Sequence, residues 1–88
     1  MSLTVIARLS IEGWDKFAPS FAGRAEARAA AGLELNAYRN MDDPNQAVVI
    51  GTVPSKEALM EFISTPEQQE AMKDAGIQGP PDMAFLEG

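Results

Sequence analysis

Residues 3–11 read LTVIARLSI. Apolar side chains occupy every second position of it, namely Leu3, Val5, Ala7, Leu9 and Ile11. Successive side chains of a strand point to opposite faces of a sheet, so this period of two predicts a β-strand with one buried face. The other face carries Thr4, Arg8 and Ser10, but it also carries the apolar Ile6.

After Gly13 the apolar residues recur every three or four positions, at Trp14, Phe17, Phe21 and Ala25. This period, together with the alanine-rich end that follows it, predicts a helix over residues 14–31. Pro19 lacks the N–H that a helix interior uses, so we expect a kink or a restart there. Gly32 stands where a left-handed residue commonly ends a helix.

Two further strands are predicted on either side of a turn. Residues 33–40 alternate between apolar and polar side chains, and residues 47–53 form an apolar run. The segment between them, Asn40-Met41-Asp42-Asp43-Pro44-Asn45, is rich in residues whose short polar side chains bond to nearby backbone amides. The two strands should therefore form a hairpin.

Two helix starts follow the hairpin. Ser55 is expected to cap a helix whose buried stripe consists of Leu59, Phe62 and Ile63. Thr65 is expected to cap another, because Pro66 suits the first helical position and Gln68 completes the spacing of a capping box. Gly76 should end that helix.

Residues 82–87 follow Gly79-Pro80-Pro81 and alternate as a closing strand. The predicted order is β-α-β-β-α-β, an α+β ferredoxin-like fold in which both helical regions cover one face of a four-stranded antiparallel sheet. We expect one domain, residues 1–88, because half of this length could not bury a core of its own.

The composition excludes several classes of function. The chain carries 7 Lys and Arg against 13 Asp and Glu, and its net charge of −6 repels nucleic acid and anionic membrane surfaces. It has no His and no Cys, the usual zinc and haem ligands and common catalytic groups, so we expect neither a metal nor another cofactor. The N-terminus shows no basic segment ahead of an apolar core, and a cytoplasmic location is expected.

Apolar side chains on both faces of the sheet predict a homodimer. Val48, Val49 and Ile50 are consecutive, and a strand must place neighbours like these on opposite faces. The helices can cover only one face, so we expect the other to pack against the same face of a second copy. The expected interface residues are Ile6, Arg8, Val48 and Ile50.

Several segments resemble a known superfamily. They are Trp14-Asp15-x-Phe17-x-Pro19-x-Phe21, Arg28 with Gly32, Tyr38-Arg39-Asn40-x-Asp42-Asp43-Pro44-Asn45, and Ala75-Gly76-x-x-Gly79-Pro80-Pro81 with Phe85. Over nearly the whole chain this pattern resembles the dimeric α/β barrel superfamily, above all its small bacterial members of the antibiotic biosynthesis monooxygenase-like and cyclase-like type. The resemblance implies a barrel of two four-stranded sheets, with a small-molecule cavity in each subunit between sheet and helices.

The same resemblance implies a cofactor-independent monooxygenase or cyclase that acts on a small apolar or aromatic, polyketide-like substrate. Haem-binding members rely on a histidine, which this chain lacks. Quinone-forming members arrange Tyr, Trp and Asn around an aromatic substrate, and the residues of these types here include Tyr38, Trp14, Asn36 and Asn40. The catalytic candidates are Tyr38, Asn36 and Arg39, as groups that would stabilise charge on the substrate.

Each candidate also has a structural interpretation. The expected ligand pocket consists of Trp14, Phe17, Phe21 and Phe62, but aromatic residues at helical spacing suit a filled core equally well. Tyr38 also suits a hydrogen bond across a dimer, and the segment from Arg39 to Asn45 suits a turn. Arg24 and Arg28, one turn apart, are typical of an exposed helix surface.

A second class of function stays open, namely a non-catalytic dimer that binds a small apolar ligand or has a stress-related accessory role. None of the 13 carboxylates lies in an evidently apolar segment. Acid or base catalysis at neutral pH would require a carboxylate with a strongly shifted pKa, and this favours the non-catalytic class.

Overall fold

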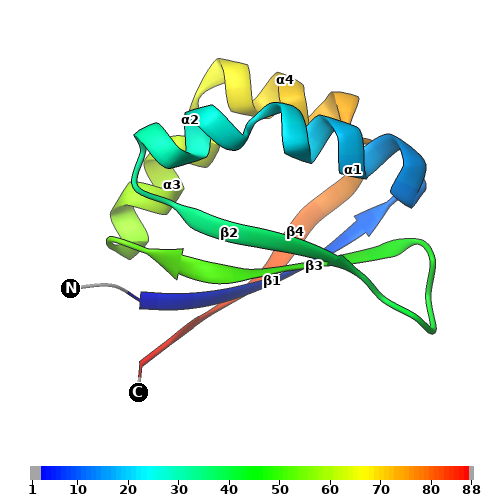
Figure 1. Cartoon of the computed structure of the whole chain (residues 1–88), viewed down its shortest axis with the longest axis horizontal. Coiled ribbons are helices and arrows are strands. Elements are labelled where there is room, and N and C mark those ends of the chain that lie inside the picture. The colour runs from blue at the N-terminus through cyan, green and yellow to red at the C-terminus, as the bar shows by residue number, and fades with distance from the viewer. Residues whose placement is uncertain (1–2, 88) are drawn as a thin grey trace.

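The computed structural model describes residues 3–87, which form one four-stranded antiparallel sheet with helices on one side (Figure 1). The strands are β1 (Leu3–Ile11), β2 (Glu34–Arg39), β3 (Gln46–Val53) and β4 (Ile77–Leu86). Their order across the sheet is β2-β3-β1-β4, so the first and third strands lie at the centre. The alternating stretch at residues 3–11 is thus a central strand, as its pattern predicts.

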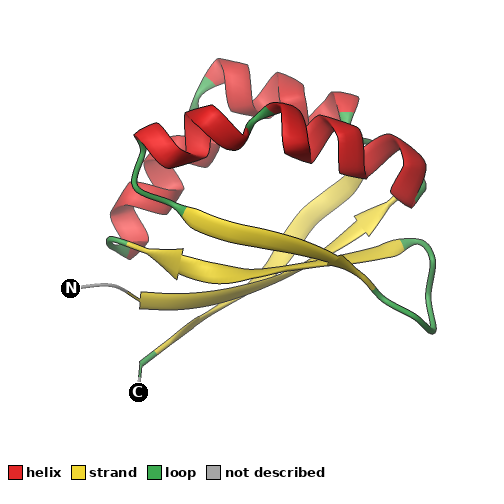
Figure 2. Ribbon diagram, viewed as in Figure 1, coloured by secondary structure: helices red, strands yellow, loops and turns green. Residues whose placement is uncertain are grey.

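The helices lie together on one face of the sheet (Figure 2). They are α1 (Trp14–Gly23), α2 (Ala25–Ala30), α3 (Lys56–Ser64) and α4 (Pro66–Asp74). The predicted ferredoxin-like α+β order is confirmed, with each helical region divided into two consecutive helices. None of the helices between residues 3 and 87 combines the length and apolar character that crossing a bilayer requires.

The first helical region breaks at Arg24, whereas the sequence predicts a kink or restart at Pro19. Arg24 has φ −104° and ψ 11°, outside the helical range, while Pro19 lies within α1. Phe17 and Phe21, on either side of the proline, pack into the core and hold that turn in place. Gly23, a poor helix former, immediately precedes the break.

The predicted helix ends are confirmed, except for one side-chain bond. Gly32 and Gly76 have φ of +79° and +78°, the left-handed conformation in which glycine ends a helix. Ser55 Oγ accepts a hydrogen bond of 3.1 Å from the amide of Ala58 and caps α3. Thr65 Oγ1 accepts one of 3.2 Å from the amide of Gln68 and caps α4, but the Gln68 side chain bonds elsewhere.

The last strand is longer than the sequence predicts. It begins at Ile77 instead of residue 82 and runs through Gly79-Pro80-Pro81. Its register against β1 shifts between Arg8 and Ser10, where a bulge accommodates prolines that cannot donate to the ladder. A φ of +75° at Gly79 accompanies this irregularity.

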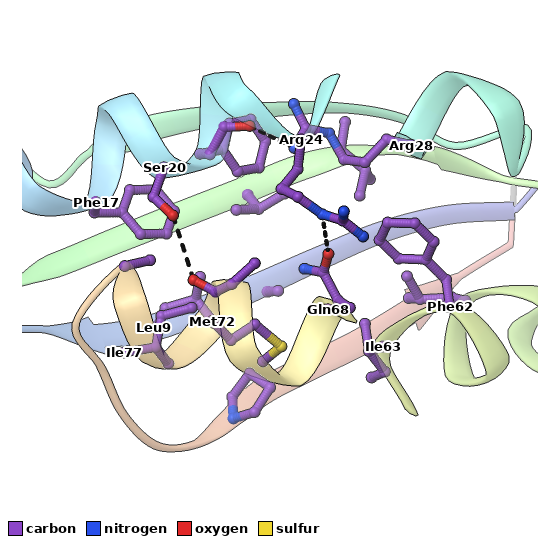
Figure 3. A pocket seen from close by; sticks show the side chains of 18 of the residues that line it. Leu9, Phe17, Ser20, Arg24, Arg28, Phe62, Ile63, Gln68, Met72 and Ile77 are labelled. Carbon is purple, nitrogen blue, oxygen red and sulfur yellow. Dashed lines mark hydrogen bonds between the residues drawn. The ribbon is translucent and has the colours of Figure 1, made fainter. Parts of the chain in front are cut away.

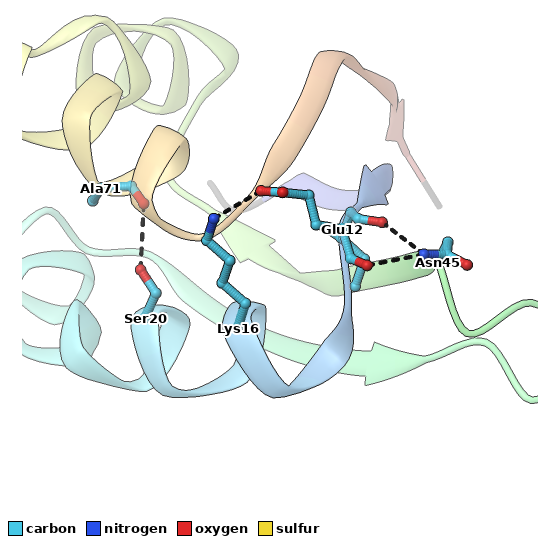
Figure 4. Close-up of polar contacts among 6 residues, drawn as sticks. Glu12, Lys16, Ser20, Asn45 and Ala71 are labelled. Carbon is cyan, nitrogen blue, oxygen red and sulfur yellow. Dashed lines mark hydrogen bonds and ion pairs between the residues drawn. The ribbon is translucent and has the colours of Figure 1, made fainter.

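The hairpin turn between β2 and β3 is built from side-chain bonds to the backbone, as predicted. Asn40 Oδ1 accepts a bond of 2.9 Å from the amide of Asp42, and Asp43 Oδ1 accepts one of 3.0 Å from the amide of Asn45. Asn45 Nδ2 donates to the carbonyl oxygen of Glu12 at 3.0 Å (Figure 4). The turn is thereby tied to the end of β1.

The core lies between the sheet and the helices. Its largest fully buried side chains are Phe17, Ile11, Val5 and Val53. On the opposite face of the sheet, which we call the outer face, none of the helices within residues 3–87 lies over the strands (Figure 2). Ile6 stands opposite Ile50 there, and Arg8 stands opposite Val48 on one side and Asp82 on the other. Ile50 and Tyr38 keep exposed fractions of 40% and 54%.

Candidate functional site

A cavity lies between the sheet and the helices, beneath α1 and α4 (Figure 3). Its volume is about 100 Å³, and its mouth is open to solvent. This is smaller than a typical small-molecule site of roughly 300–1,000 Å³, so a bound ring system would extend into the open mouth. The walls are mostly aliphatic and aromatic, contributed by all four helices and by all four strands of the sheet.

Three aromatic side chains line this cavity, and the sequence predicts all three as pocket residues. Phe17 and Phe21 come from α1, and their ring centres lie 5.6 Å apart. Phe62 comes from α3. Aromatic rings therefore make up part of an apolar lining that suits a ring system.

The fourth predicted pocket residue, Trp14, lies elsewhere. It contacts the ring of Phe17, with the ring centres 5.7 Å apart, but it lines a separate shallow hollow together with Arg39 and Asn45. Its position at the first turn of α1 places it beyond the end of the cavity. The prediction for Trp14 is corrected accordingly: it packs against a cavity-lining residue instead of facing the cavity.

The polar groups of the cavity form bonds that join the helices. Ser20 Oγ donates a hydrogen bond of 3.3 Å to the carbonyl oxygen of Ala71, joining α1 to α4 (Figure 4). Arg24 Nε donates one of 3.0 Å to Gln68 Oε1, and its guanidinium carbon lies 5.8 Å from the centre of the Phe62 ring. Both bonds cross between the first and second helical regions.

Arg28 is the most buried charged residue in the described part of the chain, with 8% of its surface exposed. Its guanidinium carbon lies 3.6 Å from the centre of the Phe21 ring, and its Nη1 donates a bond of 2.7 Å to the Phe21 carbonyl oxygen. Burial, followed by the nearby charge of Arg24, lowers the pKa of the Arg28 guanidinium. The expectation of an exposed, solvated Arg28 is therefore wrong.

Arg24 and Arg28 escape prediction because an arginine on a helix usually faces water. Their spacing nevertheless indicates that both arginines lie on the buried side of the helical region. Positions 17, 21, 24 and 28 follow steps of four, three and four, which continue the Phe17 and Phe21 stripe. Ala25, which the sequence assigns to that stripe, is exposed instead.

The catalytic candidates Asn36, Tyr38 and Arg39 lie outside the cavity. Asn36 and Tyr38 stand opposite Ile50 and Val48 on the outer face, with the whole sheet between them and the cavity. Arg39 is exposed at the end of β2 and lines the hollow beside Trp14. Within one subunit, none of the three can contact a ligand in the cavity.

The predicted interface residues share one surface. Ile6 and Arg8 from β1 and Val48 and Ile50 from β3 all lie on the outer face. Their role in dimer formation remains a prediction.

No protein-family model matches the chain, and no curated protein matches it in sequence. Solved structures do match in fold. A Bordetella bronchiseptica protein, provisionally named an antibiotic biosynthesis monooxygenase, superposes with a TM-score of 0.82 at 16% identity, covering 99% of this chain and 96% of its own. A Caulobacter crescentus protein with the same provisional name gives a TM-score of 0.78 at 19% identity, covering 99% and 89%.

SnoaB, a cofactor-independent oxygenase from Streptomyces nogalater, superposes with a TM-score of 0.75 at 18% identity, covering 99% of this chain and 92% of its own. Structural similarity at such low sequence identity establishes the fold. The chemistry has to be argued from the residues of the site. The chain therefore has the ferredoxin-like α+β fold of the antibiotic biosynthesis monooxygenase structures.

Proposed function

We propose that the chain is a cofactor-independent monooxygenase for a small, largely apolar, electron-rich aromatic substrate of polyketide-like type, bound in the cavity. A cyclase acting on the same class of substrate is the closest variant. The observation that carries the proposal is the cavity itself, with its aromatic walls and its polar groups gathered on the helices. The fold that the chain shares with SnoaB gives independent support.

The reaction we propose is the oxidation of a ring CH2 to a carbonyl by dioxygen, as in the conversion of an anthrone to an anthraquinone. Loss of a proton gives the substrate anion, which passes one electron to dioxygen. The resulting radical and superoxide combine as a carbon-bound peroxide, which takes up the proton. Loss of water then breaks the O–O and remaining C–H bonds. Four electrons leave the substrate, one oxygen atom enters it and the other departs as water.

The chain's contribution to this reaction is positioning and electrostatics. The apolar lining, which includes the Phe62 ring, would hold a flat substrate in one orientation and exclude water from the reactive anion and radical. Among residues 3–87, Arg24 and Arg28 are the ionisable groups that line the cavity, so the lining supplies no carboxylate base. The first proton would therefore pass to water at the mouth.

We further propose that the protein acts as a homodimer that covers the outer face. Ile6, Val48 and Ile50 form an apolar centre on that face, and Arg8 and Asp82 lie side by side at its edge. A two-fold axis through such a face can bring Arg8 of one subunit to Asp82 of the other, so the face is complementary to itself. Any role of Asn36 and Tyr38 would then belong to this interface.

Oxygen uptake with 1,8-dihydroxyanthrone tests the oxygenase. We expect uptake well above the spontaneous rate, with one dioxygen consumed per quinone formed. Ala71→Phe, which places a ring inside the cavity, should reduce the rate at least tenfold, whereas Ala29→Phe on the exposed side of α2 should not. Uptake equal to buffer, or an equal effect of the two variants, would refute the proposal.

A non-catalytic ligand-binding dimer is the alternative, and the cavity lining gives it one specific argument. Neither Arg24 nor Arg28 can act as a general base at neutral pH. Binding of an aromatic ligand that Ala71→Phe abolishes, without oxygen uptake by any hydroxyanthrone or hydroquinone, would favour this alternative.

A further inference from the structure

Two positive charges meet at the wall of the cavity with no negative charge beside them. Arg24 and Arg28 lie one helical turn apart and both line the cavity, whereas no Asp or Glu among residues 3–87 does. The chain as a whole carries a net charge of −6, so this local excess runs against its overall charge. Among residues 3–87 the ion pair that forms is Lys16 with Glu12, which leaves both arginines without a carboxylate partner.

This arrangement is energetically costly for the folded protein. Like charges one turn apart repel each other, and burial removes water that would screen them. Arg28 offsets part of that cost through the face of the Phe21 ring and one bond to a carbonyl oxygen. Neither partner carries a full negative charge. An anion placed between the two guanidinium groups would neutralise them in a largely apolar setting, where charge-assisted hydrogen bonds are strong.

Donors remain for such an anion. Arg24 bonds Gln68 through Nε, which leaves its two Nη groups, and Arg28 bonds Phe21 through Nη1, which leaves Nε and Nη2. Figure 3 shows the Arg24 side chain reaching toward Gln68 and Phe62. The Arg28 side chain turns back over the Phe21 ring. An apolar body can therefore lie against the rest of the cavity lining while its charged end meets the arginines.

We propose that the cavity selects organic anions, with a carboxylate or an ionised phenol or enol on an aromatic body, and that Arg24 and Arg28 bind the anionic oxygen. As a statement about the substrate, this rests on the proposed oxygenase function; as a statement about binding, it stands without turnover. In the oxygenase, the same contact favours the ionised form of the substrate, which is the form that reacts with dioxygen.

Calorimetric titration with 2-naphthoate and 2-naphthalenemethanol tests the selection, because the two probes share a ring system and differ in charge. We expect the full chain to bind the carboxylate at least tenfold more tightly at pH 7. Arg28→Met, which keeps length and apolar contact, should remove most of this preference while leaving the alcohol's affinity within about twofold. Lys73→Gln removes a charge from the exposed end of α4 and should leave the preference unchanged.

Arg24→Gln provides an independent variant, because Arg24 is only partly buried and its loss threatens folding less than the loss of Arg28. It should also reduce the preference. Backbone NMR shifts on adding 2-naphthoate should gather at residues such as Phe62 and Ala71, and not at Ile50 on the outer face. Equal affinity for the two probes, a preference that survives both arginine variants, or shifts confined to the outer face would overturn the proposal.

Neither probe is an oxygenase substrate, so the binding experiment tests the anion site independently of the proposed oxygenase activity. A carboxylate preference without oxygen uptake by hydroxyanthrones would refute the oxygenase and support the anion site. Oxygen uptake that is unchanged in a folded Arg28→Met variant, together with equal probe affinities, would refute the anion site and support the oxygenase.

Discussion

Arg24 Nε donates a hydrogen bond of 3.0 Å to Oε1 of Gln68, a residue 44 positions further along the chain. The bond joins the break between α1 and α2 to the first turn of α4. It also explains why Gln68 does not complete the capping box that its spacing predicts, because its side-chain oxygen is engaged across the cavity wall.

We expect Gln68→Ala to lower the free energy of unfolding by about 1 kcal/mol, the usual contribution of one such bond. Urea denaturation followed by circular dichroism measures this change. Glu70→Ala truncates an exposed side chain of the same helix and should cost less than half as much. Equal losses in the two variants would show that the bond to Arg24 contributes nothing.

Gly51 lies where no side chain fits. A Cβ built there would stand 2.8 Å from the Cα of Leu35 and nearer still to the carbonyl oxygen of Glu34. We expect Gly51→Ala to destabilise the fold by at least about 3 kcal/mol, the upper part of the range for overpacking. Gly23→Ala meets open space and should leave stability unchanged or raise it by up to about 1 kcal/mol. Thermal denaturation compares the two variants, and similar melting temperatures would contradict the backbone contact.

Ile50 supplies the sharpest test of the proposed dimer. It is 40% exposed at the centre of the outer face, whereas Met41 is 95% exposed in the hairpin turn. We expect Ile50→Lys to raise the dimer dissociation constant at least a hundredfold, since it buries a charge in an apolar contact. Met41→Lys should leave the constant within about threefold. Native mass spectrometry and light scattering across a dilution series give the values, and a monomeric parent protein would refute the dimer.

Arg8 tests the polar edge of the same face. It stands opposite Asp82, and we expect Arg8→Ala to weaken the dimer about tenfold through the loss of contacts across the two-fold axis. Lys73→Ala removes a charge from a helix on the other side of the molecule and serves as the control. An Arg8→Ala dimer as tight as the parent would exclude Arg8 from the interface.

The strands and the helix ends could be predicted because each depends on local pattern. The alternation in residues 3–11 predicts β1. Ser55 and Thr65 mark helix starts and Gly32 a helix end, through bonds or backbone angles that involve only neighbouring residues. Pro19 was a poorer guide than Gly23 to the helix break, because packing of the flanking phenylalanines outweighs the one hydrogen bond that proline forgoes.

The site was harder to predict because it depends on what lies opposite each side chain. Arg28 is buried against the Phe21 ring, and a local rule for charged helix residues cannot anticipate that. Tyr38 and Asn36 match the residue types of an aromatic site, but alternation along β2 carries them to the face without a cavity. Residue type alone therefore suggests a catalytic group of side chains that the fold does not bring together at the cavity.

The lack of space at Gly51 has a consequence beyond stability. Val48, Val49 and Ile50 are all apolar, so sliding β3 by one position would still bury an apolar side chain on each face. Hydrophobicity along this strand therefore discriminates poorly between alternative strand alignments. Sliding would bring Ile50 or Thr52 to the place where the Glu34 carbonyl admits only hydrogen. The need for glycine opposite Leu35 therefore fixes the register between β2 and β3, and this register determines which valine faces the cavity.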